Sequence, residues 1–299
     1  MPELPEVQTI VSDLNEKIVG YTIVDFWSDW PKAIKGKSLK EFQKEGVNRK
    51  IINVRRLGKN IFIDLSGKKT LYIHLKMTGH LLVKSQKSIK SKAQKDYFSD
   101  RVNQYIHHIW YLQTKNKKLQ TSLEFSDMRK FAKIVLDDTQ KINELPEMKK
   151  LGVDLMDKNF TLKKFMDILA KSAQGRSASG GKQIGIILMD QELMSGIGNI
   201  YRSEILFEVG IHPEHRIEKL SEKEIKDIYK CIKKVLAKAI KMRGTSDSDY
   251  RDTSGAPGNF QKVLKVYRRT GKKCSRCGTI IKRMTLGQRS VFYCPKCQK

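Results

Sequence analysis

Two Cys-x-x-Cys pairs within the last 26 residues constrain the fold of this chain more than any other feature of its sequence. The pairs are Cys274 with Cys277 and Cys294 with Cys297, and sixteen residues lie between them. Each pair can form a tight turn that directs two thiolates at one ion, and the interval can form a β-hairpin. Four thiolates leave no open coordination position, so we expect one structural Zn²⁺ ion that takes no part in chemistry. A redox dithiol is the alternative for such cysteines.

The charge of the chain favours a polyanionic partner. Its 299 residues include 59 Lys and Arg against 32 Asp and Glu, which gives a formal net charge of +27. Such an excess raises the affinity for nucleic acid, because each Lys or Arg that meets a phosphate releases counterions. Solvated lysine faces are the alternative explanation of the charge. With 39% hydrophobic residues, the chain is long and apolar enough for two or three globular domains.

The lack of a recognisable export signal and the positions of the cysteines favour a cytoplasmic protein. No apolar stretch approaches the ~18 residues that a membrane span needs, and the first residues lack the basic-then-apolar pattern of an export signal. Four of the five cysteines lie in the metal motif, which is unlike a distributed disulfide framework. We therefore expect a cytoplasmic protein with no membrane contact.

The first half of the chain has the pattern of a β-sandwich that follows one helix. Apolar residues recur at helical spacing over 5–19, and Gly20 ends this pattern. From 21 to 82 the pattern changes to short β-branched and aromatic runs, which predict antiparallel strands. The stretch 84–101 is rich in Lys, Ser and Gln and is predicted to be a solvated loop. Strands resume in "YIHHIWYLQT", "LQTSLEFSD" and "KFAKIVLDD", so a sandwich of roughly 135 residues accounts for this half.

The second half has the pattern of helices. Those predicted are "LKKFMDILAKSA", "IGIILMDQELMSG", "NIYRSEILFEVG" and a long one over "SEKEIKDIYKCIKKVLAKAIKMRG". Ser221 and Glu224 form the capping box of the last helix, and Cys231 adjoins its buried stripe as a packing thiol. Two Gly- and Ser-rich stretches interrupt the helices. One is "GRSASGG" (175–181), and the other is a connector over 243–260 that is long enough to be either functional or disordered.

Three distant stretches agree with one family. "PELPEV" at the start, "SGIGNIYRSE" in the middle and "GQRSVFYCPKC" at the end together resemble the bacterial formamidopyrimidine-DNA glycosylases. The resemblance implies an α+β fold: an N-terminal β-sandwich with an N-terminal helix, a helix–two-turn–helix domain and a C-terminal zinc-finger hairpin. It implies that the protein excises oxidised purines from damaged double-stranded DNA and then cleaves the strand, as a monomer. The corresponding division is a catalytic sandwich domain over 2–138, a linker over 139–150, the helical domain over 151–243, and the capping connector with the zinc finger over 244–299.

The resemblance also gives a function to the opening "MPELPEV". Once Met1 is removed, Pro2 carries a secondary amine, and an α-amino group has an ordinary pKa of about 7.7–8.0. The positive end of the following helix disfavours the ammonium further. A neutral amine can attack C1′ of the damaged nucleoside, form a Schiff base, and lead to β,δ-elimination. The catalytic residues implied are Pro2, Glu3 as general acid and base, and Lys59, with Glu6 in support. Taken alone, the two prolines could simply mark a helix start.

Other residues are implied to hold the DNA. A lesion must leave the stack to be reached, and Met77, Arg129 and Phe131 match the family's gap-filling residues. From the sequence alone, Met77 and Phe131 would be assigned to the core. The expected phosphate contacts are His74, His108, Asn199 and Arg289. Asn199 could instead be only a helix cap, and His74 only a buried imidazole.

The chain departs from the family pattern at several positions. Met128, Lys130 and Ala132 replace residues of the usual D-P-R-R-F-G, which leaves loop stiffness and partner-base preference open. Gly185 stands where the family commonly has a phosphate-approaching Lys, which Lys182 could replace. Connector 243–260 resembles the family's base-capping loop and, with "PELPE", favours oxidised purines. Two alternatives stay open: an endonuclease VIII-like preference for oxidised pyrimidines, and a non-catalytic zinc protein that binds distorted duplex.

Overall fold

The structure is a computed structural model that describes residues 1–85, 96–114, 120–174 and 182–299. Contacts divide the chain into two units, one of Met1–Lys149 with Met242–Gln261 and one of Lys150–Lys241 with Lys262–Lys299. The predicted "GRSASGG" break and most of the Lys-rich loop lie outside the described residues. The connector groups with the N-terminal unit, whereas the sequence placed it beside the zinc finger. Within the described ranges, no helix is long and apolar enough to cross a membrane.

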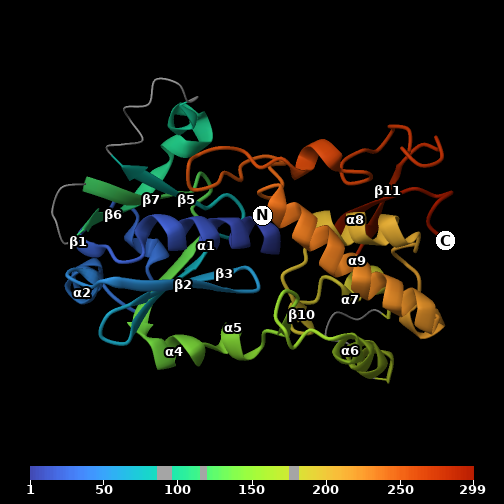
Figure 1. The fold of residues 1–299 in the computed structure, drawn as a ribbon, viewed down its shortest axis with the longest axis horizontal. Helices are drawn as coiled ribbons and strands as arrows, with labels where there is room; N and C mark the ends of the chain where they lie inside the picture. The colour runs from blue at the N-terminus through green and yellow to red at the C-terminus, as the bar shows by residue number, and fades with distance from the viewer. Residues whose placement is uncertain (86–95, 115–119, 175–181) are drawn as a thin grey trace. The chain divides into compact units, whose positions relative to one another are not determined.

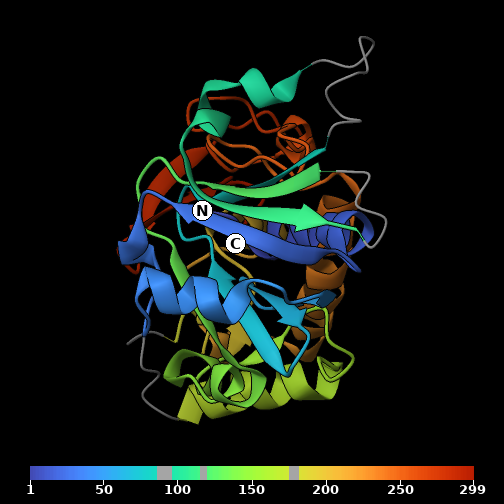
Figure 2. The same ribbon diagram turned by 90° about the vertical axis from the view of Figure 1, so that its left-hand side faces the viewer.

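The N-terminal unit is built on two four-stranded antiparallel sheets, as the alternating patterns predicted (Figure 2). One sheet has the order β1-β6-β7-β5 and the other β2-β3-β4-β8. The strands are β1 (Thr22–Ser28), β2 (Ile51–Leu57), β3 (Asn60–Leu65), β4 (Lys69–His74), β5 (His80–Ser85), β6 (Ile106–Gln113), β7 (Gln120–Ser126) and β8 (Lys133–Asp138). The β-sandwich is thus confirmed.

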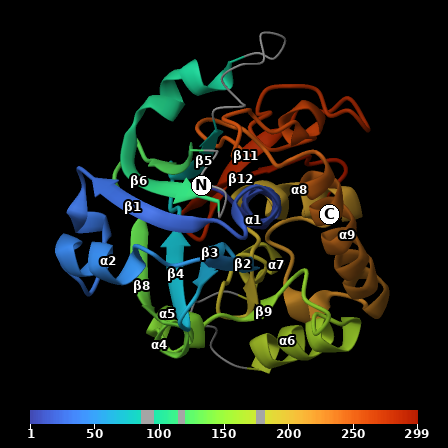
Figure 3. The ribbon, with the colours of Figure 1, turned by 60° about the vertical axis from the view of Figure 1, so that its left-hand side comes forward.

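Two helices cover the open sides of this sandwich. Helix α1 (Leu4–Ile18) contacts β2 and β5, which are edge strands of opposite sheets. Helix α2 (Leu39–Gly46) contacts β1 and β8, the other two edges (Figure 3). Exposed strand edges invite pairing with other chains, and a covering helix removes that liability. The short helices α4 (Thr139–Asn143) and α5 (Pro146–Lys149) follow β8.

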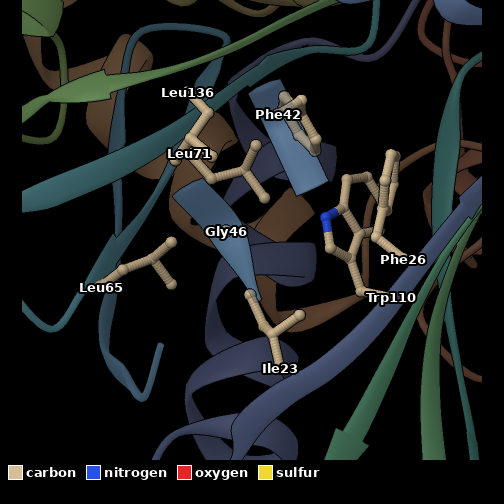
Figure 4. Close-up of a pocket in the computed structure, with 8 residues that line it drawn as sticks. All are labelled: Ile23, Phe26, Phe42, Gly46, Leu65, Leu71, Trp110 and Leu136. Atoms are coloured by element: carbon tan, nitrogen blue, oxygen red, sulfur yellow. The ribbon is translucent and has the colours of Figure 1, made fainter. Parts of the chain in front are cut away.

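Helix α2 is absent from the prediction, which assigned 21–82 to strands. Ser38 caps this helix, since its hydroxyl accepts from the Glu41 amide while the Glu41 carboxylate accepts from the Ser38 amide at 2.8 Å. The Ser-x-x-Glu spacing is a helix-start signal that could have located it. Phe42 and Gly46 are its buried residues. They face a core cavity of about 10 Å³, too small for a ligand, between side chains from both sheets (Figure 4).

The C-terminal unit is mainly helical. Its helices are α6 (Leu162–Gln174), α7 (Ile184–Ile187), α8 (Asn199–Val209) and α9 (Glu222–Lys241). Two short strands, β9 (Val153–Asp154) and β10 (Met194–Ser195), pair in parallel. The capping box of α9 is confirmed, because the Glu224 carboxylate accepts from both the amide and the hydroxyl of Ser221 at 2.7 Å. Cys231 is buried on this helix, as predicted.

One predicted helix is much shorter than expected. The segment "IGIILMDQELMSG" forms only the single turn α7, and Met194 and Ser195 pair with Val153 and Asp154 instead. Apolar spacing in so short a segment cannot separate a helix from buried turns. The chain ends in an antiparallel hairpin of β11 (Lys282–Leu286) and β12 (Arg289–Tyr293), as the cysteine spacing predicted (Figure 1).

Candidate active site and nucleic-acid interface

The first turn of α1 buries the residues predicted to carry the chemistry. Pro2 is buried, and Glu3 and Glu6 are 3% and 1% exposed. The Glu3 amide donates to Glu6 Oε2 at 2.7 Å, and the Thr245 amide of the connector donates to Glu6 Oε1 at 2.7 Å. One carboxylate therefore caps the helix and holds the connector. Gly244 makes this approach possible, since a Cβ at that position would lie 2.7 Å from Glu6 Oε1.

Lys59 lies at the tip of the β2–β3 hairpin, next to the same helix. Its side chain is only 7% exposed, unlike that of an ordinary turn lysine. The hairpin contacts α1 through Arg56, whose Nε donates to Gln8 Oε1 at 2.9 Å. Asn60, the next residue, pairs across the sheet with His74.

His74 is partly buried at the end of β4. Burial and the neighbouring charges of Lys76 and Lys59 lower the pKa of His74 to about 4. Its Nδ1 accepts from the Lys76 amide at 3.0 Å, so the neutral ring carries its proton on Nε2. His74 therefore offers one neutral N–H donor beside two ammonium groups, which suits contact with an anion.

Met77 and Phe131 are exposed, contrary to their assignment as core residues from sequence alone. Met77 is 38% and Phe131 52% exposed, and the Arg129 guanidinium lies 4.6 Å from the centre of the Phe131 ring. Met128, at 45% exposed, adds a third apolar side chain, and exposed apolar side chains that gather in this way are typical of a contact surface. The three side chains implied to fill the gap in DNA are thus available to a partner.

Asp127 holds the two loops that carry these side chains. It is fully buried, and its Oδ2 accepts from the amides of Phe131 and Ala132 at 2.9 and 3.0 Å. Its Oδ1 accepts from the Arg129 amide at 3.2 Å and from the hydroxyl of Thr78, the residue after Met77. Lys130 has a φ of 54°, so the turn contains a left-handed residue that is not Gly. These bonds fix the loop despite its departures from the family pattern.

The structure argues against a phosphate contact from His108. Its ring is 0% exposed and lies within 6.0 Å, centre to centre, of four aromatic rings, those of Phe26, Trp30, Trp110 and Phe125. Neither ring nitrogen has a hydrogen-bond partner among the described residues. Burial lowers the pKa of His108 to about 3. His108 lies on the same face of β6 as the buried Trp110 and Leu112, so strand alternation places its ring in the core.

In the C-terminal unit, Asn199 and Arg289 line one groove. Its volume is about 670 Å³, and its walls also carry Arg268, Arg283 and Gln288. Asn199 is the first residue of α8 and not its cap, which is Gly198. The Asn199 side-chain oxygen accepts from the guanidinium of the buried Arg202, which fixes its orientation. Arginines beside a helix N-terminus form an anion-binding site.

The four cysteines of the hairpin fit one zinc ion. Their sulfurs lie within 4.8 Å of one another, with 3.9 Å between Cys274 and Cys297 and 3.5 Å between Cys277 and Cys294. Zn–S bonds of about 2.3 Å in a tetrahedron require sulfur separations of about 3.8 Å. The donor set and its spacing therefore suit a closed tetrahedral site that supports the hairpin.

Known proteins match the whole chain. Family models match residues 1–134 (formamidopyrimidine-DNA glycosylase N-terminal domain), 151–251 (formamidopyrimidine-DNA glycosylase H2TH domain) and 271–299 (zinc finger found in FPG and IleRS). A formamidopyrimidine-DNA glycosylase of Carboxydothermus hydrogenoformans is 38% identical over 299 residues, with 100% of both chains covered. The chain belongs to the formamidopyrimidine-DNA glycosylase family.

Solved structures of this glycosylase family share the fold. A complex between the Lactococcus lactis Fpg and DNA containing an abasic site has a TM-score of 0.81 at 29% identity, with 99% of both chains covered. A mutant of the same protein in complex with DNA containing Fapy-dG has a TM-score of 0.82 at 30% identity, with 100% of both chains covered. The resemblance inferred from three short stretches thus extends over the full length of this glycosylase.

Gly185, where the resemblance implies a lysine, has no room for a side chain. A Cβ at this position would lie 2.7 Å from the carbonyl oxygen of Pro213 and 2.8 Å from Leu286 Cδ2. The Gly185 carbonyl also accepts from Arg202 Nη1 at 3.0 Å. The backbone is packed too closely here for any side chain, so a lysine would require the surrounding loops to move.

Sequence reasoning missed the residues that position others. Besides Asp127, Glu204 of α8 is 3% exposed and accepts from the backbone amides of Lys265, Val266 and Tyr267 at 2.9–3.0 Å. Burial raises its pKa, although these amide bonds act in the opposite direction. Asp127 ends the predicted strand "LQTSLEFSD", and Glu204 ends the family stretch "SGIGNIYRSE". An acidic residue beside predicted core positions was the available signal.

Proposed function

We propose that this glycosylase excises oxidised purines, 8-oxoguanine and formamidopyrimidines, from duplex DNA and then cleaves the strand at the abasic sugar. The nucleophile is the amine of Pro2, exposed when Met1 is removed. The observation that carries this proposal is the buried start of α1. Pro2 directly precedes the buried Glu3, and the buried Glu6 one turn further on accepts a backbone hydrogen bond on each of its oxygens.

The chemistry follows from the groups present. The Pro2 nitrogen attacks C1′, the glycosidic bond breaks, and the departing base takes a proton that Glu3 can supply. The C1′–O4′ bond then breaks: the proton lost by the Pro2 nitrogen passes through Glu3 to O4′, and the open sugar is left as an iminium that acidifies the C2′ proton. A base removes that proton, and the 3′ phosphate leaves by β-elimination. A second elimination releases the 5′ phosphate. The charge of the Lys59 ammonium and the neutral N–H of His74 support a contact with a phosphate of the strand.

The remaining residues support binding of damaged duplex DNA. Met77, Arg129 and Phe131 are exposed side chains on loops fixed by Asp127, which suits insertion into the space that an everted nucleotide leaves. The groove of Asn199 and Arg289 suits a backbone phosphate. Relatives solved with abasic-site and Fapy-dG DNA point to the same class of partner.

Borohydride trapping tests the proposal. Intact-mass measurement should first show the chain without Met1. Reduction in the presence of an 8-oxoguanine:C duplex should then give a covalent adduct that maps to Pro2, and Pro2→Gly should lose it while duplex binding survives. A parallel thymine-glycol duplex tests substrate class: a strong preference for the pyrimidine lesion would overturn the purine assignment. Equal trapping by Pro2→Gly would overturn the nucleophile.

A further inference from the structure

The connector (243–260) meets α1 at a second place besides Glu6. Arg243 donates through Nη1 and Nη2 to the two carboxylate oxygens of Asp13 on α1, at 3.1 and 2.6 Å. The same guanidinium donates through Nε and Nη2 to Asp252 Oδ2 at 2.9 and 2.7 Å. Arg243, Asp13 and Asp252 are called the Arg243 clamp below.

The clamp is more than a surface ion pair. Asp13 and Asp252 are 6% and 3% exposed, and the Arg243 side chain is 40% exposed. Removal of the cation from such a pair leaves buried carboxylates uncompensated, which destabilises the contact. Arg243 also has a φ of 62°, so its backbone is held in a left-handed conformation that non-Gly residues seldom adopt.

The clamp orders the turn that follows it. Asp252 uses Oδ2 for Arg243 and Oδ1 for the amides of Ser254 and Ala256, at 2.8 and 3.1 Å. Thr253, which is fully buried, donates to Asp13 Oδ2 at 2.8 Å. The chain from 252 to 256 is thereby fixed to α1 through side chains on both partners.

The clamp and Glu6 share one face of α1. Glu6 and Asp13 are seven residues apart, which is close to two helical turns. The connector runs along this face, with Thr245 at Glu6 and with Arg243 and Thr253 at Asp13. A displaced clamp would therefore move the segment that binds Glu6.

We propose that Arg243 is a positioning residue for base excision, which holds the connector in register on α1 so that the connector forms one wall of the site beside Pro2 and Glu6. This rests on the proposed function. A base is bonded directly to the C1′ that the amine attacks, so an everted base must lie next to this wall. A preformed abasic site presents the same C1′ without a base, and its cleavage does not need the wall.

The experiment compares two substrates under single-turnover conditions. Arg243→Met and Asp252→Asn are measured on an 8-oxoguanine:C duplex and on a duplex with a preformed abasic site. Misplacement of a group at a reaction centre costs up to about a hundredfold, so we expect base excision to fall at least about tenfold and abasic-site cleavage to change less than about threefold. Arg243→Lys should recover only part of the loss, because one ammonium cannot make the paired bonds of a guanidinium.

Lys69→Gln is the matched control, since Lys69 bridges Glu45 and Asp138 elsewhere in the same unit at 2.9 and 2.8 Å. It should leave both rates unchanged. Asp252→Asn, which keeps the shape of the side chain, gives the answer if Arg243→Met does not fold. Equal loss on the two substrates, or loss on neither, would overturn the positioning role. If the unaltered protein forms no adduct on either substrate, the proposed function fails instead.

Discussion

Thr78 and Asp127 are hydrogen-bonded through their side chains although 49 residues separate them in the chain. This bond joins the loop of Met77 to the loop of Arg129 and Phe131. Both partners are buried, so three exposed side chains rest on one shielded contact.

Asp127→Asn should weaken action on duplex DNA more than on single-stranded DNA. The amide keeps one acceptor oxygen and turns its NH₂ group toward backbone donors, and leaving such buried groups unpaired costs about 1–3 kcal/mol. Only a duplex presents a gap to be filled, so the ratio of excision rates on the two substrates should fall. Asp157→Asn is the control, because Asp157 also accepts from a loop amide, that of Asn159 at 2.7 Å. An unchanged ratio for Asp127→Asn would contradict the role of the loops.

Replacing Cys294 by Ser should remove zinc and most DNA affinity. Three thiolates no longer close the tetrahedral site, and the free energy of metal binding is also the free energy that folds such a hairpin. Metal analysis should find about one zinc per chain before the change and far less after it. Cys231→Ser should keep the metal, since Cys231 is buried on α9 and burial raises the pKa of its thiol to about 12. Full zinc content in Cys294→Ser would refute the site.

Gly185→Lys should destabilise the protein and should not improve DNA binding. The new Cβ would meet the Pro213 carbonyl, and overpacking of this kind costs about 1–3 kcal/mol. Urea unfolding measures the cost, and a duplex titration measures the affinity. A stable variant that binds more tightly would show that the loops around Pro213 give way.

His108→Phe should make the protein more resistant to acid. The pKa of His108 is about 3 in the folded protein and about 6.5 in an unfolded chain, so the unfolded state takes up the proton first as pH falls. Between these values each fall of one pH unit lowers the free energy of unfolding by about 1.4 kcal/mol. The variant with Phe at this position does not suffer that loss. Urea unfolding at pH 8 and pH 5 should show a smaller difference for the variant.

His80→Phe is the comparison variant, because His80 is a buried histidine whose ring nitrogens have hydrogen-bond partners. Both His80 nitrogens are hydrogen-bonded, to the Thr78 carbonyl and the Asn103 side chain, at 3.2 and 2.8 Å. This variant should lose stability at pH 8 already. An equal pH dependence in His108→Phe and the unaltered protein would mean that His108 is not the titrating group.

Arg289→Gln should lower the salt dependence of DNA binding. Each phosphate contact contributes about 0.9 to the slope of log affinity against log salt, so the slope should fall by about one. Arg276→Gln is the control, because Arg276 is bound to the Phe207 carbonyl at 3.1 Å and to Glu208. A slope unchanged by Arg289→Gln would remove this residue from the phosphate contacts.

Local patterns predicted local structure well. The alternation of strands, the capping box at Ser221 and the cysteine spacing each depend on neighbours within a few residues. Two local misses have physical causes. Buried turns after α7 imitated helical spacing, and helix α2 was missed within a stretch assigned to strands. The phosphate contact of His108 came from the family resemblance, whereas strand alternation with Trp110 and Leu112 places its ring in the core. The capping signal at Ser38 was present and unused.

The contacts that position the site could not be predicted in this way. Asp13 and Arg243 are 230 residues apart, and nothing near either residue specifies the other. The exposure of Met77 and Phe131 likewise depends on loops fixed from a distance by Asp127. The family resemblance supplied their candidate roles, whereas composition and spacing alone assigned both residues to the core.

The N-terminal unit is discontinuous in sequence, and this affects its biosynthesis. Asp13 and Glu6 leave the ribosome early, but their partners Arg243 and Thr245 are 230 and 239 residues behind. At about 5–20 residues per second, these two acids wait roughly 10–50 seconds for their partners. The connector therefore completes the N-terminal unit last. A chain whose synthesis stops before the connector would have an incomplete site and be an early target for proteolysis.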